Sequence, residues 1–239
     1  MGLLGFAVVC GVVGAFVVGP LVRHAVTRWI GWRVVLPVLL GYVPERVALG
    51  RQRVAYPRAG VVEGLCGLTF GIAAWRLGWS LPLLPVLVLS TGMVATSTVD
   101  IRCWRVPTRF VVVTGVVALG SVGVVAVAGG QPASVWGAVL GGATYFGLLG
   151  ALHMASPRQL GRGDVRLGLL IGLVVGWVGW SDAQPIAGPL QWVFQAAFAA
   201  GVIGLMVGLV LRMLRRSYQS YPFAPWLSLG AFLAIMIGV

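Results

Sequence analysis

The sequence contains few charged residues and very few acidic ones. Only 9% of the 239 residues are charged, lysine is absent, and Asp and Glu together number five. Because an ordinary soluble domain has about 25% charged residues, this composition excludes a soluble globular protein. The three cysteines, Cys10, Cys66 and Cys103, lack CxxC spacing, so neither a zinc site nor a disulfide framework is indicated. We therefore expect no metal and no other cofactor.

The basic residues do not indicate nucleic-acid binding, although they give a formal net charge of +12. All are arginines, and they lie in short segments between long apolar runs, as in a polytopic membrane protein. The apolar runs predict an all-α fold with about eight transmembrane helices, the first of them an anchor and not a removed signal peptide. The predicted spans are 2–22, 59–75, 78–98, 110–128, 133–154, 165–181, 188–211 and 222–239.

The arginines also predict how the chain is oriented. All but one of the 17 lie in alternate loops, and Arg76 alone lies on the other side. Cytoplasmic loops are enriched in Lys and Arg, so the arginine-bearing loops are expected in the cytoplasm and both termini on the extracytoplasmic side. Residues 1–58 would form the first transmembrane helix and an Arg-rich cytoplasmic loop, and 59–239 a seven-helix core. Whether 34–43 enters the bilayer stays open.

Two of the five acidic residues are placed to act together. Asp100 ends the third predicted span and Asp164 begins the sixth, both at the cytoplasmic boundary. The fourth and fifth spans form one out-and-back hairpin, so the two carboxylates return to the same depth. Such a pair could share one proton and activate water against a peptide carbonyl. Helix polarity favours an ionised Asp164 and a protonated Asp100. The alternative is two interfacial aspartates, each paired with an arginine.

Several neighbouring residues extend this interpretation. Gly161 and Gly163 lack side chains and would let a substrate backbone pass close to Asp164. Pro107 ends the exposed loop before the fourth span.

Glu63 lies about one turn inside the second span, and its expected role is structural, in a pair with Arg58 or another loop arginine. His24 and His153 lack metal-ligand spacing and are assigned no function.

Four segments together resemble the type IV prepilin peptidases, membrane aspartic proteases of the GxGD class. GRGDVRLG resembles their second catalytic motif, with Arg166 where Lys is usual, and VDIRCWRVPTR resembles the first. YPRAGVVEGLCGLTF at 56–70 resembles the family's Tyr-Pro-x-x-Glu segment, which includes Glu63. YPFAPWLSLGAF at 221–232, with Pro222 and Pro225, resembles its Pro-Phe-Gly-Pro motif.

The resemblance implies an aspartic endopeptidase of the bacterial inner membrane in which Asp100 and Asp164 activate water. Its substrate would be the helix of a prepilin or pseudopilin, cut at the cytoplasmic face behind a short basic leader, in type IV pilus assembly or protein secretion. Larger members carry two CxxC pairs and an N-methyltransferase activity in a segment after the first helix. Residues 23–58 contain no cysteine, so a peptidase without methyltransferase activity is expected.

Two other functions stay open on the sequence. A proton-coupled membrane transporter could also use membrane aspartates, although it would place them near the midplane of the bilayer. A non-catalytic membrane assembly factor could keep the fold without turnover. The expected partners are the substrate helix and membrane lipids, and the sequence does not predict an oligomeric state.

Overall fold

The computed structural model describes residues 2–30, 60–103, 106–157, 160–213 and 222–238. The described residues form helices joined by short turns, and five of these helices are long and apolar enough to cross a membrane. The elements are α1 (Leu3–Val13), the π-helical turn η1 (Gly14–Val18), α2 (Gly19–Ile30), α5 (Val61–Leu77), α6 (Leu83–Cys103), α7 (Thr108–Ala128), the 3-10 turn η3 (Pro132–Ser134), α8 (Val135–Ala155), α9 (Arg162–Val178), α10 (Ala187–Met213) and α11 (Ala224–Gly238).

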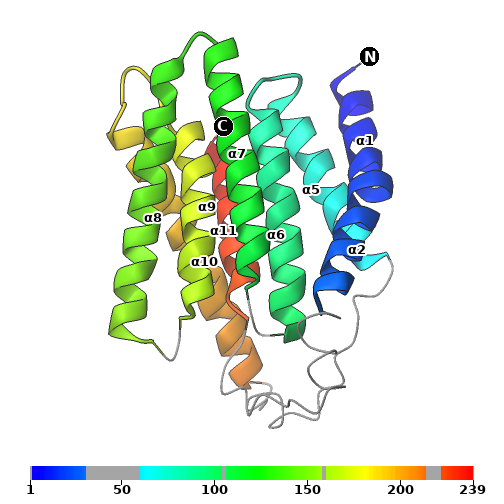
Figure 1. Ribbon diagram of the computed structural model, residues 1–239, viewed down its shortest axis with the longest axis vertical. Helices are drawn as coiled ribbons and strands as arrows, with labels where there is room; N and C mark the ends of the chain where they lie inside the picture. Colours follow the sequence, from blue (N-terminus) through cyan, green and yellow to red (C-terminus); the bar gives the residue numbers. More distant parts are fainter. Residues whose placement is uncertain (1, 31–59, 104–105, 158–159, 214–221, 239) are drawn as a thin grey trace.

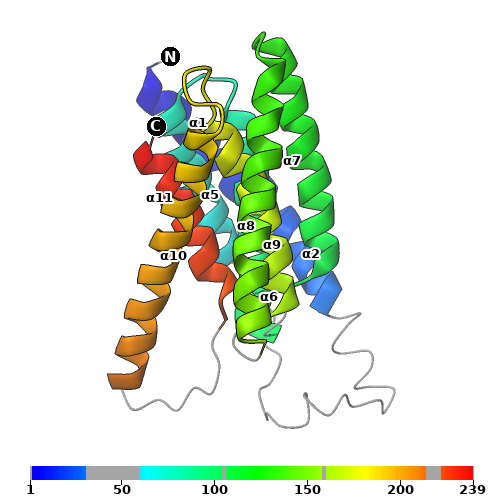
Figure 2. The ribbon, with the colours of Figure 1, turned by 90° about the vertical axis from the view of Figure 1, so that its left-hand side faces the viewer.

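The helices stand side by side as a membrane bundle. Because α1, η1 and α2 follow one another without a break, the described residues contain eight helical rods, each overlapping one predicted span. The predicted all-α polytopic membrane fold is confirmed. The start of α1 and the end of α11 lie at the same end of the bundle (Figure 1, Figure 2), as an even number of crossings requires. Which side of the membrane this end faces stays a prediction, and 34–43 lies outside the described residues.

The first helix is longer than predicted. The span was expected to end at residue 22, before the first arginine, but the helix continues to Ile30. Val22 and Val26 are buried against α5 and α6, and Arg23 pairs with Glu63 on α5. The charged residues therefore lie on one side of an amphipathic final segment, and the helix continues past them. The predicted division of the chain at 58/59 falls outside the described residues.

The third helix is shifted by about one turn from its prediction of 78–98. Gly78 ends α5 with a positive φ of 61°, a backbone conformation that favours glycine. A short turn follows, and α6 begins only at Leu83. At its other end α6 continues to Cys103, so Asp100 lies in the last turn and is not the final residue. This places the Asp100 side chain against neighbouring helices.

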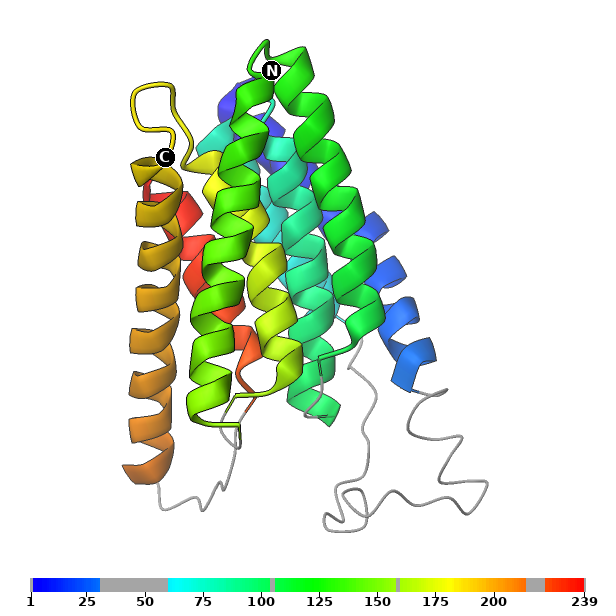
Figure 3. The same ribbon diagram turned by 60° about the vertical axis from the view of Figure 1, so that its left-hand side comes forward.

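Close glycine packing places α9 in the bundle. Gly141 on α8 and Gly172 on α9 lie so near each other that a Cβ added to either would meet the backbone carbonyl oxygen of the other. Small residues allow such close approach between membrane helices. Besides α8, α9 contacts α6, α7, α10 and α11, and Figure 3 shows it between α8 and α6 with α11 behind. The helix that carries Asp164 is therefore enclosed on most sides.

Candidate active site

Asp100 is buried where α6 meets the beginning of α11. Its side chain is 5% exposed, and its Oδ2 accepts a hydrogen bond from the backbone N–H of Ala224 at 3.1 Å. The backbone of Phe223 also hydrogen-bonds to this carboxylate. The first N–H groups of a helix have no partner within it and attract anions. The start of α11 thus serves as a hydrogen-bonding site for Asp100.

Asp164 is buried in the first turn of α9. Its side chain is 8% exposed, and its Oδ2 accepts a hydrogen bond from the N–H of Gly161 at 3.1 Å. In return, the N–H of Asp164 donates to the carbonyl of Gly161 at 3.1 Å. The other oxygen, Oδ1, is buried without a hydrogen-bond partner among the described residues. One oxygen of Asp164 is therefore fixed by its own helix start, and the other is available for another group.

The fold brings the two aspartates to one end of the bundle. The last turn of α6 and the first turn of α9 both lie at the end opposite the start of α1 (Figure 1). The two helices are in contact, and both carboxylates are buried at this end. This arrangement provides two buried acids at one place in the fold. Their catalytic roles stay a prediction.

The segment that follows Asp100 contacts the beginning of α9, the helix that carries Asp164. A Cβ added to Gly163 would lie 2.7 Å from the Cβ of Val106, so only glycine fits against this loop. Next to Val106, Pro107 is buried and directly precedes α7. The Nη1 of Arg166 donates to the Oγ1 of Thr108 at 2.7 Å. Glycine, proline and arginine of the two motifs therefore hold the starts of α7 and α9 together.

Glu63 is tied to the first helix. Its Oε1 accepts a hydrogen bond from Arg23 Nε at 2.6 Å, and its Oε2 accepts one from the N–H of Gly60 at 2.8 Å. These contacts fit the structural role expected from the sequence, with Arg23 as the partner. The alternative partner Arg58 lies outside the described residues.

The start of α11 provides a hydrogen-bond donor to Asp100 that the sequence interpretation missed. Pro222 is half-buried just before the helix, and Pro225 occupies its second position, where a missing N–H costs nothing. The backbone N–H of Ala224 between them reaches Asp100. Both aspartates therefore face a helix N-terminus, so helix polarity does not distinguish the ionised member of the pair. The proline-rich motif was the sequence signal that could have indicated this helix start. The donor itself is a backbone N–H, and the sequence does not show which backbone N–H reaches Asp100.

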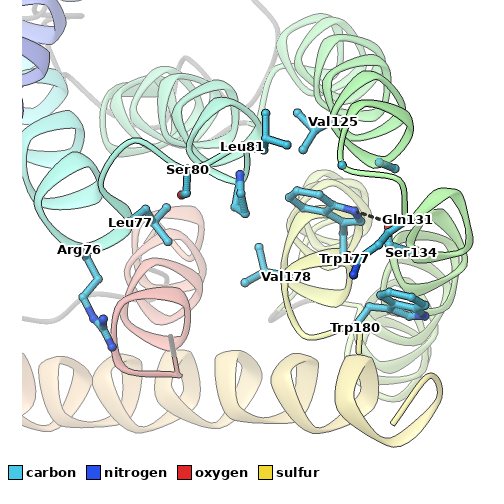
Figure 4. Close-up of a pocket in the computed structure, with 13 residues that line it drawn as sticks. Arg76, Leu77, Ser80, Leu81, Val125, Gln131, Ser134, Trp177, Val178 and Trp180 are labelled. Atoms are coloured by element: carbon cyan, nitrogen blue, oxygen red, sulfur yellow. Dashed lines mark hydrogen bonds between the residues drawn. The ribbon is translucent and has the colours of Figure 1, made fainter. Parts of the chain in front are cut away.

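The opposite end of the bundle contains a cavity of about 500 Å³. Figure 4 shows Ser80, Leu81, Val125 and Trp177 around it, and Trp177 Nε1 donates to Ser134 Oγ at 2.9 Å. Its lining includes no acidic residue. Over the described part of the chain, no group of three His, Cys, Asp or Glu residues is arranged to hold a metal ion.

Comparison with known proteins gives one family. The model of the type IV leader peptidase family matches residues 87–209, just over half of the chain, and this range includes both aspartates. Three curated relatives are each named prepilin leader peptidase/N-methyltransferase. No solved structure matches the chain.

The relatives are distant but similar over most of this chain. The Stutzerimonas stutzeri protein is 26% identical over 74% of this chain, the Pseudomonas putida protein 27% over 90%, and the Bacillus subtilis protein 27% over 77%. The matches span 58%, 69% and 66% of those relatives, respectively. The chain belongs to the type IV leader peptidase family.

Proposed function

We propose that this protein is a membrane aspartic endopeptidase that removes the short basic leader from a prepilin or pseudopilin. The observation that carries the proposal is the pair of buried carboxylates, Asp100 and Asp164, which lie at the same end of the bundle on two helices that contact each other (Figure 1). The family and the printed names of the relatives support the same reaction. No side-chain set of comparable chemistry lines the cavity at the other end.

The proposed mechanism uses the two carboxyl groups in opposite protonation states. The ionised carboxylate removes a proton from water as the water oxygen attacks the scissile carbonyl carbon. The protonated partner donates its proton toward the carbonyl oxygen, which carries the developing negative charge. Proton transfer to the amide nitrogen then lets the C–N bond break, so that an amine and a carboxylic acid are released. General acid–base catalysis of this kind contributes about 10²–10⁴-fold to a rate.

The position of the aspartates supports a peptidase more than a transporter. Asp100 lies in the last turn of α6 and Asp164 in the first turn of α9. A transporter would hold its acids near the middle of the membrane, whereas here both lie at helix ends. Cleavage at a membrane surface requires this placement, since the leader lies outside the bilayer and the substrate helix within it. With the arginine-bearing loops in the cytoplasm, the site would open at the cytoplasmic face of the inner membrane.

The direct test is leader removal from a prepilin. The full chain is co-expressed with a prepilin that has a short basic leader, and processing is followed by the gel shift of the shortened product. Wild-type protein should cleave, whereas Asp100→Asn and Asp164→Asn should not, with all three present in the membrane at equal levels. Ser80→Ala, at the other end of the bundle, is the matched control. Cleavage in either aspartate variant to the same extent as in wild type would contradict the proposal.

We also propose that the chain acts as a peptidase alone. The names of the relatives include an N-methyltransferase, but segment 23–58 contains no cysteine. Mass spectrometry of the cleaved pilin measures this directly. An unmodified N-terminus on the mature product is the expected result, and a mass increase of one methyl group would overturn this part of the proposal.

A further inference from the structure

His153 makes a hydrogen bond to the segment that leads into α9. It lies half-buried in the last turn of α8, and its Nδ1 is 2.7 Å from the carbonyl oxygen of Leu160. A carbonyl oxygen only accepts hydrogen bonds, so Nδ1 carries the hydrogen of this pair. The acceptor residue, Leu160, is itself buried and directly precedes Gly161.

The two ends of one peptide group connect His153 to Asp164. The Leu160 carbonyl and the Gly161 N–H belong to the same peptide unit, which is planar and places the two groups in opposite directions. While the carbonyl accepts from His153, the N–H donates to Asp164 Oδ2 at 3.1 Å. Neither group can rotate without the other. Hydrogen bonds linked in series also polarise one another, which strengthens the bond to the carboxylate.

We propose that His153 is a positioning residue that orients the Asp164 carboxylate through this peptide group. By fixing Gly161, it holds Oδ2 against the helix start. The oxygen left to act on water is Oδ1, which is buried and has no hydrogen-bond partner among the described residues. This inference rests on the proposed peptidase function. It gives a role to a histidine for which the sequence offered none.

The fold has other contacts that keep this segment in place without His153. The N–H of Ser156 donates to Leu152 at 2.9 Å, and the N–H of Leu160 donates to Ser156 at 3.3 Å. The Leu160 side chain is buried, and glycine contacts hold α9 against α8. Loss of the imidazole should therefore leave the bundle folded while the 160–161 peptide becomes free to tilt.

Two amide substitutions separate positioning from a structural role. The side-chain nitrogen of asparagine occupies the place of Nδ1, whereas that of glutamine occupies the place of Nε2. His153→Asn should therefore keep kcat for prepilin cleavage within about threefold of wild type, and His153→Gln and His153→Leu should lose about tenfold or more at similar KM. His24→Gln, on an exposed residue of α2, is the matched control. Equal kcat values for His153→Asn and His153→Leu would overturn the proposal.

Nitrogen NMR tests the hydrogen bond without any substrate. In a His24→Gln background the chain contains one histidine, so its ¹⁵N shifts report the tautomer of His153 alone. At alkaline pH the hydrogen should lie on Nδ1. A hydrogen on Nε2 would contradict the inference even if the enzyme cleaves prepilin. If the tautomer is as expected but wild-type protein never cleaves prepilin, the failure is that of the proposed function.

Discussion

The two ends of the bundle differ in what they offer to chemistry. At one end, a cavity of about 500 Å³ is lined by Ser80, Trp177 and mainly apolar neighbours. At the other, Asp100 and Asp164 are nearly enclosed, and each is held by a backbone N–H at a helix start. Space alone would select the first end as the functional one. Buried acids are costly in a membrane and mark function more strongly, so this comparison teaches that charge, and not volume, identifies the site.

The largest expected effect comes from the acids themselves. Asp100→Asn or Asp164→Asn should lower kcat for prepilin cleavage on the order of 10³-fold or more, because each amide can neither accept nor deliver the required proton. Ser80→Ala should leave kcat within about twofold. The kcat values of all three variants are measured with purified protein in detergent. A comparable loss in Ser80→Ala would reverse the comparison between the two ends.

A smaller effect is expected from the contact between the two motif segments. Gly163→Ala places a Cβ 2.7 Å from the Cβ of Val106, which should displace the loop and lower kcat about tenfold, at a cost of about 1–3 kcal/mol in unfolding free energy. Adding Val106→Gly should restore part of the activity. Gly147→Ala is the control, since nothing lies within 4 Å of its added Cβ. If the double variant is no more active than Gly163→Ala, the steric explanation is wrong.

At the cavity end, a substitution should change stability and spare activity. Ser134→Ala removes the acceptor of the buried Trp177 N–H. An unsatisfied buried donor costs about 1–3 kcal/mol, so the thermal unfolding temperature should fall. Cleavage per folded molecule should stay within about twofold of wild type. A large loss of cleavage at unchanged stability would show that this end takes part in the reaction.

The smallest effect concerns Glu63. Its partner Arg23 is 40% exposed, and solvent screens such pairs, so Glu63→Gln should lower the unfolding free energy by about 0.5–1 kcal/mol. Arg23→Gln should have a similar effect, and the double variant should cost little more than either single change. Thermal unfolding of the four proteins completes this cycle. A loss of cleavage in Glu63→Gln without loss of stability would give Glu63 a catalytic role.

The sequence predicted the helices well because charge is so rare in it. Each long apolar run became a helix. The two aspartates could be identified as candidate site residues because the sequence has only five acidic residues. The predicted end of the first helix was wrong because Arg23 forms an ion pair with Glu63 on α5, which lies 40 residues further along the chain. Pairing over such a separation leaves no local pattern.

The support around the aspartates could not be predicted for a different reason. The N–H of Ala224 and the peptide between Leu160 and Gly161 are backbone groups, and every residue except proline has them. Only the packing of α11 and α8 decides which of them reach Asp100 or His153. The sequence therefore identified the acids, whereas their orientation required the structure.

The claim that Asp100 and Asp164 work as one unit is tested most directly by a double-variant cycle. Single-turnover cleavage of a prepilin is measured for wild type, Asp100→Asn, Asp164→Asn and the double variant. Residues that act together lose activity non-additively, so the double variant should cleave no more slowly than the slower single variant. A double variant slower by the product of the two single losses would show that the carboxylates act independently, contrary to this account.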